Sequence, residues 1–185
     1  RQEHDRIIRR IGRGDEAVVN PARVQACAIG ASREENARLM AGVYASRGLS
    51  ALVFRGANTG LDELTTTDKN QVWIVSGGSV TPTEFDARES LGMASSSIED
   101  LAGGEAAENA AVARDVLSGG GADAVRDAVA LNVGAGILAW EGLENPVTQA
   151  DFAERMRGAV ERALGALADG SGARLIERWV EASNA

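Results

Sequence analysis

Short apolar runs alternate with a helix-like stretch in the first third of the chain. "VQACAIG" at residues 24–30 and "SALVF" at residues 50–54 each have the length and composition of a buried strand. Between them, Ser32 and Glu35 form a capping-box pattern, and apolar positions then recur on one helical face as far as Arg47. Strand, helix and strand in this order predict a parallel βαβ unit.

The rest of the chain changes from β-rich to helical. "QVWIVSGG" and "SVTPTEF" are two β-rich runs separated at Gly77 and Gly78, which predicts a hairpin. After Gly103 the apolar positions follow helical spacing, and residues 125–140 are apolar almost all round, as in a helix buried between layers. Together these patterns predict an α/β fold with a central, mostly parallel sheet, a β-hairpin, flanking helices and a helical C-terminal part.

The length of the chain, 185 residues, is enough for one domain with a real core and too short for two ordinary ones. Residues 1–20 are predicted to be a polar N-terminal segment of uncertain structure, and residues 21–185 a single α/β domain. The three tryptophans, Trp73, Trp140 and Trp179, are expected to pack inside this domain.

Composition narrows the range of functions. The formal charge of -8, from 19 basic and 27 acidic residues, disfavours a general affinity for nucleic acid or for anionic membranes. No apolar run approaches the length of a membrane span, and a cytoplasmic location is expected. Cys27 is the only cysteine and His4 the only histidine, which excludes an intramolecular disulfide and offers no zinc or iron-sulfur cluster.

An acidic pair follows the second predicted strand, in the stretch "GLDELTTT" at residues 60–67. Asp62 and Glu63 are adjacent carboxylates, which repel each other unless solvent, a cation or a basic partner compensates them. Ligands of α/β proteins bind at the carboxyl ends of strands, and Mg²⁺ takes one or two carboxylates and completes its shell with water and phosphate oxygens. On spacing alone, a solvated turn is the simpler interpretation.

The wider sequence resembles the second half of anthranilate phosphoribosyltransferase. The resemblance covers most of the chain from about Asn20, and "GLDELTTT" is its most specific part, together with "ALVFRG", "NPARVQACAIG", "IEDLAGGEAAENAAVARDVLSGG" and "VRDAVALNVGAGI". Enzymes of that family transfer a phosphoribosyl group from phosphoribosyl pyrophosphate to anthranilate in tryptophan biosynthesis, and they use magnesium. The resemblance implies Mg²⁺ as cofactor and Asp62 and Glu63 as its ligands; no catalytic base is assigned, and the substrate-binding residues stay unknown.

The resemblance also leaves two interpretations open. The family's glycine-rich loop, its lysine-histidine-glycine-asparagine segment and its anthranilate-contacting arginine belong to the first half of the family and have no counterpart in this sequence. One interpretation is therefore a transferase whose metal and pyrophosphate side this chain supplies and which is active only with the missing N-terminal half. A homo-oligomer is a further expected assembly. The alternative is a catalytically inactive, truncated family member that folds, or assembles with a partner, without performing the transfer.

Overall fold

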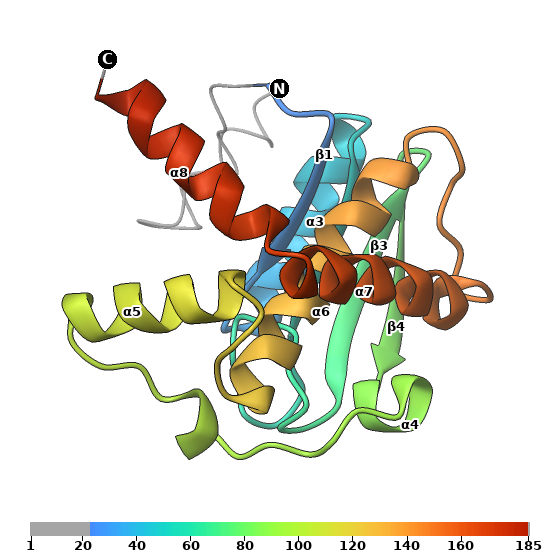
Figure 1. Cartoon of the computed structure of the whole chain (residues 1–185). Coiled ribbons are helices and arrows are strands. Elements are labelled where there is room, and N and C mark those ends of the chain that lie inside the picture. Colours follow the sequence, from blue (N-terminus) through green and yellow to red (C-terminus); the bar gives the residue numbers. More distant parts are fainter. Residues whose placement is uncertain (1–22, 185) are drawn as a thin grey trace.

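The structure, a computed structural model, describes residues 23–184, so the predicted segment 1–20 lies outside the described residues. Its centre is a four-stranded sheet in the order β1-β2-β3-β4 (Figure 1). The strands are β1 (Ala26–Gly30), β2 (Ser50–Gly56), β3 (Asn70–Ser76) and β4 (Ser79–Phe85). β1 and β2 are parallel, whereas β2, β3 and β4 pair antiparallel, so the described sheet is mixed rather than mostly parallel.

The predicted βαβ unit is confirmed as β1, α3 (Glu34–Ser46) and β2. The predicted capping box is not formed: Arg33 occupies the N-cap position of α3 and makes no side-chain cap. Side chains of β2 alternate between the two faces of the sheet, as strand geometry requires. Ala51 and Val53 pack with α3, while Leu52 and Phe54 pack on the opposite face.

The predicted hairpin is also confirmed. β3 and β4 are joined by Gly77 and Gly78, whose φ angles of 57° and 77° lie in the left-handed region that glycine adopts without strain. Two positive φ values in a two-residue loop match the right-handed twist of the flanking strands. This tight turn fixes β4 antiparallel to β3, and the antiparallel pairing of β2 with β3 already makes the sheet mixed.

The second face of the sheet is covered by helices α6 (Asp123–Glu141) and α7 (Phe152–Ala168). α6 lies on β1 and β2. α7 packs beside α6 and reaches the β4 side, where Phe152 meets Phe85 in an edge-to-face contact with ring centroids 5.4 Å apart. The core therefore has two layers of side chains, one on each face of the sheet.

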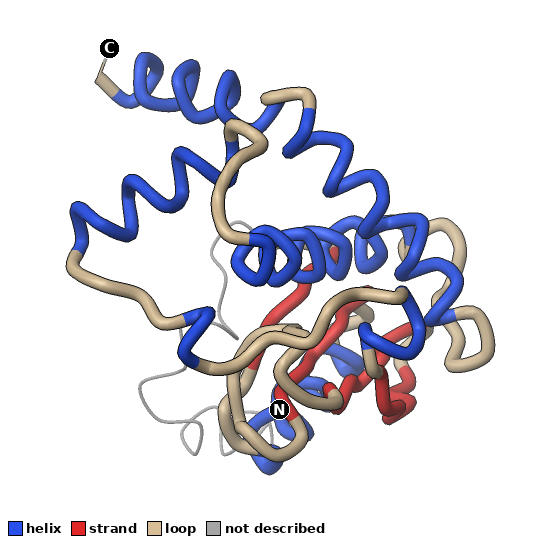
Figure 2. The backbone as a smooth tube through the Cα atoms, turned by 60° about the horizontal axis from the view of Figure 1, so that its bottom comes forward, coloured by secondary structure: helices blue, strands red, loops and turns tan. Residues whose placement is uncertain are grey.

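The remaining elements are α4 (Ala87–Leu91), η2 (Glu99–Leu101), α5 (Ala106–Leu117) and α8 (Ser171–Ser183). α5 and α8 extend beyond the sheet in Figure 1, and Figure 2 shows the C-terminal helix leaving the body of the molecule. None of the helices in residues 23–184 combines the length and the apolar character that crossing a bilayer requires.

The expectation that all three tryptophans pack inside the domain is wrong for two of them. Trp73 on β3 is buried, but Trp140 on α6 is 67% exposed and Trp179 on α8 is 70% exposed. The helices predicted around Trp140 and Trp179 are confirmed, because the two residues lie in α6 and α8. Periodicity identifies the apolar face of a helix but does not say whether a neighbour covers it.

Candidate functional site

Asp62 and Glu63 lie in the loop that joins β2 to β3, which we call the acidic loop (residues 57–69). β1 and β2 are parallel, so their carboxyl ends lie at the same end of the sheet, and the acidic loop follows β2 at this end. Both side chains are exposed. The structure therefore places the predicted pair where α/β proteins bind their ligands.

The carboxyl end of β1 fixes the backbone under Asp62. A Cβ atom built on Gly30 would lie 1.5 Å from the Asp62 carbonyl oxygen and 2.2 Å from its carbonyl carbon. Only a residue without a side chain permits this approach of two backbones. Gly30 ends the run "VQACAIG", and its close contact with the acidic loop gives that glycine a role that the sequence pattern alone did not reveal.

The first turn of the acidic loop is closed by Asp68. Its carboxylate accepts hydrogen bonds from the backbone N–H groups of Ala57, Asn58 and Thr59, at 3.0, 3.0 and 2.8 Å. The Gly56 N–H also donates to the Leu61 carbonyl at 2.8 Å, which completes the turn immediately before the acidic pair. A carboxylate that accepts several backbone N–H groups orders a loop strongly.

The second half of the loop is held by two asparagines. Asn132, in the middle of α6, accepts from the Leu64 N–H at 3.1 Å and donates to the Leu64 carbonyl at 2.9 Å. Asn70 does the same for the next residue, Thr65, at 3.1 and 3.0 Å. These reciprocal amide contacts satisfy both backbone groups of two consecutive buried residues.

The threonines that follow the acidic pair have a structural role. Thr65 and Thr66 are buried, the Thr65 and Thr67 hydroxyls are 2.7 Å apart, and the Thr66 hydroxyl lies 2.8 Å from that of Ser96. Their hydroxyl groups therefore serve one another and a neighbouring segment. Asp62 and Glu63 stand on a backbone that is fixed on both sides.

The acidic residues of the loop differ in whether other groups contact their carboxylates. Asp68 is engaged by the backbone, whereas no ion pair or hydrogen bond links the Asp62 or Glu63 carboxylate to another residue within 23–184. Nearby, Asp86 accepts charge-assisted hydrogen bonds from the Arg88 guanidinium, and this contact lowers the pKa of Asp86 to about 2. Asp86 is therefore already paired with a cation, whereas Asp62 and Glu63 have no such partner among the described residues.

The chemistry of these donors suits Mg²⁺ brought by a substrate. Within the described residues, no group of three or more histidine, cysteine, aspartate or glutamate side chains forms a metal cage. Mg²⁺ does not need one, because it usually keeps several waters and binds through one or two carboxylates plus phosphate oxygens. Two exposed carboxylates on a fixed loop match that requirement.

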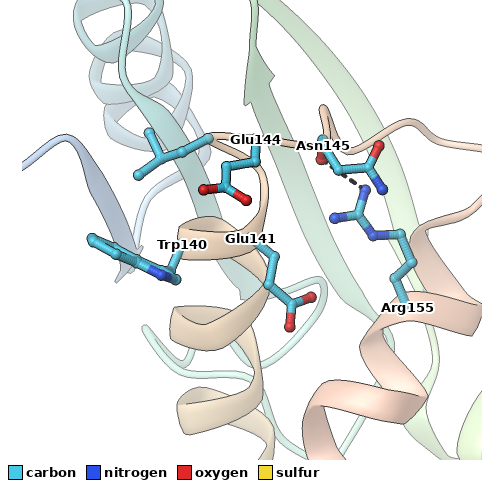
Figure 3. A pocket seen from close by; sticks show the side chains of 6 residues that line it. Trp140, Glu141, Glu144, Asn145 and Arg155 are labelled. Atoms are coloured by element: carbon cyan, nitrogen blue, oxygen red, sulfur yellow. Dashed lines mark hydrogen bonds between the residues drawn. The ribbon is translucent and has the colours of Figure 1, made fainter.

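A hollow at the opposite end of the sheet does not form a comparable site. It has a volume of about 340 Å³ and is lined by Trp140, Glu141, Leu143, Glu144, Asn145 and Arg155 (Figure 3). Arg155 donates to the Asn145 carbonyl at 3.0 Å, and Glu141 is paired with Arg162. Two of its charged groups, Glu141 and Arg155, are thus already partnered. It lies beside Gly142, which contacts Ser50 at the start of β2, far along the strand from the acidic loop.

Comparison with known proteins decides the family. The sequence model of the "Glycosyl transferase family, a/b domain" matches residues 17–173. The chain belongs to this family. Within it, the chain is 47% identical over 164 residues to the anthranilate phosphoribosyltransferase of Arthrobacter sp. (strain FB24), a match that covers 88% of this chain and 44% of that protein. The enzyme of Nocardia farcinica (strain IFM 10152) is 44% identical over 170 residues, covering 90% and 48%.

Solved structures of the same enzyme share the fold. Anthranilate phosphoribosyltransferase from Thermus thermophilus superposes with a TM-score of 0.69 at 32% identity, over 84% of this chain and 42% of that one. The Saccharomyces cerevisiae enzyme in complex with PRPP and Mg has a TM-score of 0.68 at 20% identity, over 83% and 41%. The resemblance seen in the sequence is confirmed, and the chain spans less than half the length of the relatives it matches.

Proposed function

We propose that this chain supplies the metal and pyrophosphate side of a phosphoribosyl transfer from phosphoribosyl pyrophosphate to anthranilate. The observation that carries the proposal is the exposed pair Asp62 and Glu63, which lies on a fixed loop at the carboxyl ends of β1 and β2. The supporting comparison is the 47% identity to an anthranilate phosphoribosyltransferase across most of this chain. The yeast neighbour, solved with PRPP and Mg, supports the same substrate class for this fold.

Asp62 and Glu63 are the residues that would hold Mg²⁺ together with the pyrophosphate oxygens. When bound, the metal would stabilise the negative charge that develops on the leaving pyrophosphate. The chain's own contribution is positioning. Asp68 and Asn132 hold the backbone before and after the pair, so the main chain that carries the two carboxylates is fixed without help from the ligand.

Neither carboxylate is assigned a proton-transfer role. Transfer breaks the bond between the ribose C1 carbon and the pyrophosphate oxygen and leaves cationic character on the sugar, so charge stabilisation lowers the barrier without a general base on this side. The acceptor amine of anthranilate would approach from the other face of the sugar. Within this proposal, the acidic loop acts on the leaving group only.

The alternative is a family member that folds but performs no transfer. It is favoured by one observation, namely that the chain spans less than half the length of the relatives it matches. The two functions differ in whether the acidic loop binds its ligand. A cytoplasmic location is proposed with either function.

The experiment is titration calorimetry of the purified chain with phosphoribosyl pyrophosphate, in Mg²⁺ and in EDTA. The proposal predicts Mg²⁺-dependent binding that is lost in the double variant Asp62→Asn/Glu63→Gln. The matched control is Glu177→Gln/Glu181→Gln, which removes the same two charges from exposed positions on α8 and should bind as the wild type does.

Two results would overturn the proposal. Binding of phosphoribosyl pyrophosphate that is equal with and without Mg²⁺ would show that the metal plays no part in it. Binding that is equally weakened by both double variants would show that net charge, rather than the acidic loop, governs the interaction.

A further inference from the structure

Arg55 is a cation at the carboxyl end of β2 whose charge is not cancelled by an acidic side chain. Its Nε donates to the Ser32 carbonyl at 3.4 Å, and its Nη1 donates to the Ala57 carbonyl at 3.2 Å and to Oε1 of Gln71 at 2.6 Å. All three acceptors are neutral. No carboxylate within residues 23–184 forms an ion pair with Arg55. Because arginine is always charged in proteins, a full positive charge is held at this position.

The guanidinium of Arg55 lies beside the segment that leads to the acidic pair. A Cβ atom built on Gly60 would lie 3.4 Å from Nη2 of Arg55 and 3.3 Å from the Ser32 carbonyl oxygen. Gly60 is two residues before Asp62, and Cα atoms at this spacing are at most about 7 Å apart. The charge of Arg55 is therefore on the order of 10 Å from Asp62, which is about one Debye length at 0.1 M salt.

Lys69 is the other cation of the acidic loop, and it differs from Arg55 in how its charge is held. The Lys69 side chain is exposed and forms no ion pair with the described residues. Solvent and salt screen such a charge strongly. Arg55 is half-buried and held by three hydrogen bonds, so its field at the acidic pair is the more constant of the two.

A fixed positive charge near two carboxylates acts in opposite directions on two kinds of ligand. It repels a free divalent cation, and it attracts a metal ion that arrives with a diphosphate, because that complex has a net negative charge. We propose that Arg55 is a specificity-determining residue, which makes the acidic pair select a metal–diphosphate complex over the free divalent ion. The inference rests on the proposed function. Arg55 acts through its charge, and it is not itself a ligand of the metal.

The test is a pair of titrations of the full chain at low salt. Mn²⁺ alone is followed by electron paramagnetic resonance, and only the Mn²⁺ that Asp62→Asn/Glu63→Gln fails to bind is counted. Phosphoribosyl pyrophosphate in excess Mg²⁺ is followed by calorimetry. Arg55→Gln, which removes the charge and keeps a hydrogen-bond donor, should bind Mn²⁺ alone about twofold more tightly and the Mg²⁺ complex at least about threefold more weakly.

The opposite signs of the two shifts separate the charge of Arg55 from a structural role. If Arg55 only held the loop in place, its loss would misplace both carboxylates and weaken the binding of both ligands. Arg55→Met is a second neutral variant that keeps an unbranched side chain, and it should show the same two shifts. Arg55→Lys keeps the charge and should leave both affinities close to those of the wild type.

Two control variants remove a positive charge elsewhere. Arg178→Gln makes the same change in net charge at an exposed position on α8 and should alter neither affinity. Lys69→Gln removes the screened cation of the acidic loop and should shift both affinities less than Arg55→Gln does. Circular dichroism of each variant checks that it is folded.

Four outcomes would overturn the inference. The first two are weaker binding of both ligands by Arg55→Gln and Arg55→Met, and shifts of the same size in Arg178→Gln, which would assign them to net charge. The third is an Arg55→Lys variant that behaves as Arg55→Gln does, because the shape of the guanidinium would then be the cause.

The fourth outcome is a wild-type chain that shows no Mg²⁺-dependent binding of phosphoribosyl pyrophosphate. In that case the proposed function fails, and this inference fails with it. If the wild type does require Mg²⁺ and the opposite shifts are absent from the Arg55 variants, only the inference about Arg55 is wrong.

Discussion

Replacement of Gly30 by alanine tests the contact that fixes the acidic loop. The new Cβ would lie 1.5 Å from the Asp62 carbonyl oxygen, whereas ordinary contacts begin at 3.4 Å, so β1 and the loop must separate by roughly 2 Å. Gly30 does not have a positive φ angle, so alanine meets no backbone strain there. The whole effect of the substitution is therefore steric.

The expected cost of this overlap is about 1–3 kcal/mol in the free energy of unfolding, the range found when a packed region is forced to accept extra atoms. The displaced loop should also bind Mg²⁺ and phosphoribosyl pyrophosphate at least about tenfold more weakly, because a shift of this size misplaces both carboxylates. Urea unfolding followed by circular dichroism measures the first quantity, and calorimetry measures the second.

The control is the same change at Gly42, in the middle of α3, where a Cβ would meet nothing within 4 Å. Gly42→Ala should stabilise the chain by about 0.5–1 kcal/mol, through the higher helix propensity of alanine, and leave binding unchanged. The reasoning is refuted if Gly30→Ala has the same midpoint of urea unfolding as the wild type and binds Mg²⁺ and phosphoribosyl pyrophosphate with the same affinity.

Four further substitutions follow from the packing and the electrostatics. Asn132→Ala leaves two backbone groups of the acidic loop without partners and should cost about 1–3 kcal/mol in urea unfolding, with faster amide exchange in residues 60–67; unchanged exchange there would contradict it. Asp86→Asn should cost about 2 kcal/mol at pH 7, because the pKa of Asp86 falls from 3.8 to about 2 on folding. A pKa that is lowered on folding stabilises the fold at pH values above the pKa of the unfolded chain, and this stabilisation is lost as the pH falls through the folded-state pKa. The free energies of unfolding of wild type and variant should therefore converge between pH 4 and pH 2. If they stay equally far apart at all pH values, the ion pair with Arg88 is not the cause. Trp73→Ala should lower the free energy of unfolding by about 3–5 kcal/mol, and Trp179→Ala by no more than about 0.5 kcal/mol. Thermal unfolding measures both, and equal shifts in melting temperature would contradict the difference in burial between the two side chains.

The sequence predicts the core elements of this fold well because their signals are local. Alternation in "SALVF" follows from burial on a sheet, and Gly77-Gly78 supplies the positive φ angles that a two-residue hairpin requires. The helix from 123 to 141 was likewise visible as an apolar run. The capping box at Ser32 failed because the chain enters α3 one residue later, at Arg33.

The parts that the sequence did not reveal depend on distant neighbours. Asn132 is a single amide in an apolar helix, and only the fold shows that it holds Leu64, which is 68 residues away. That isolated polar residue was the available signal. The exposure of Trp140 and Trp179 is equally invisible locally, since an apolar helical face looks the same whether or not a neighbour covers it.

The sequence predicts the two acidic residues of the candidate site but not the residues that hold their loop in place. Asp62 and Glu63 were identified from a short motif and a family resemblance, and the structure adds the anchors on either side of them. The role of Asp68 cannot be predicted from the sequence, because it requires three backbone N–H groups to converge, and this geometry leaves no pattern in the sequence.

The central claim is that the acidic pair meets a cation only in the company of the phosphorylated substrate. The most direct measurement is nuclear magnetic resonance of the labelled chain with Mn²⁺ in place of Mg²⁺, with and without phosphoribosyl pyrophosphate. We predict that resonances of residues 60–67 broaden selectively when both are present and much less with Mn²⁺ alone. Broadening centred elsewhere, or none with both ligands present, would contradict the assignment of Asp62 and Glu63 as the metal-binding pair.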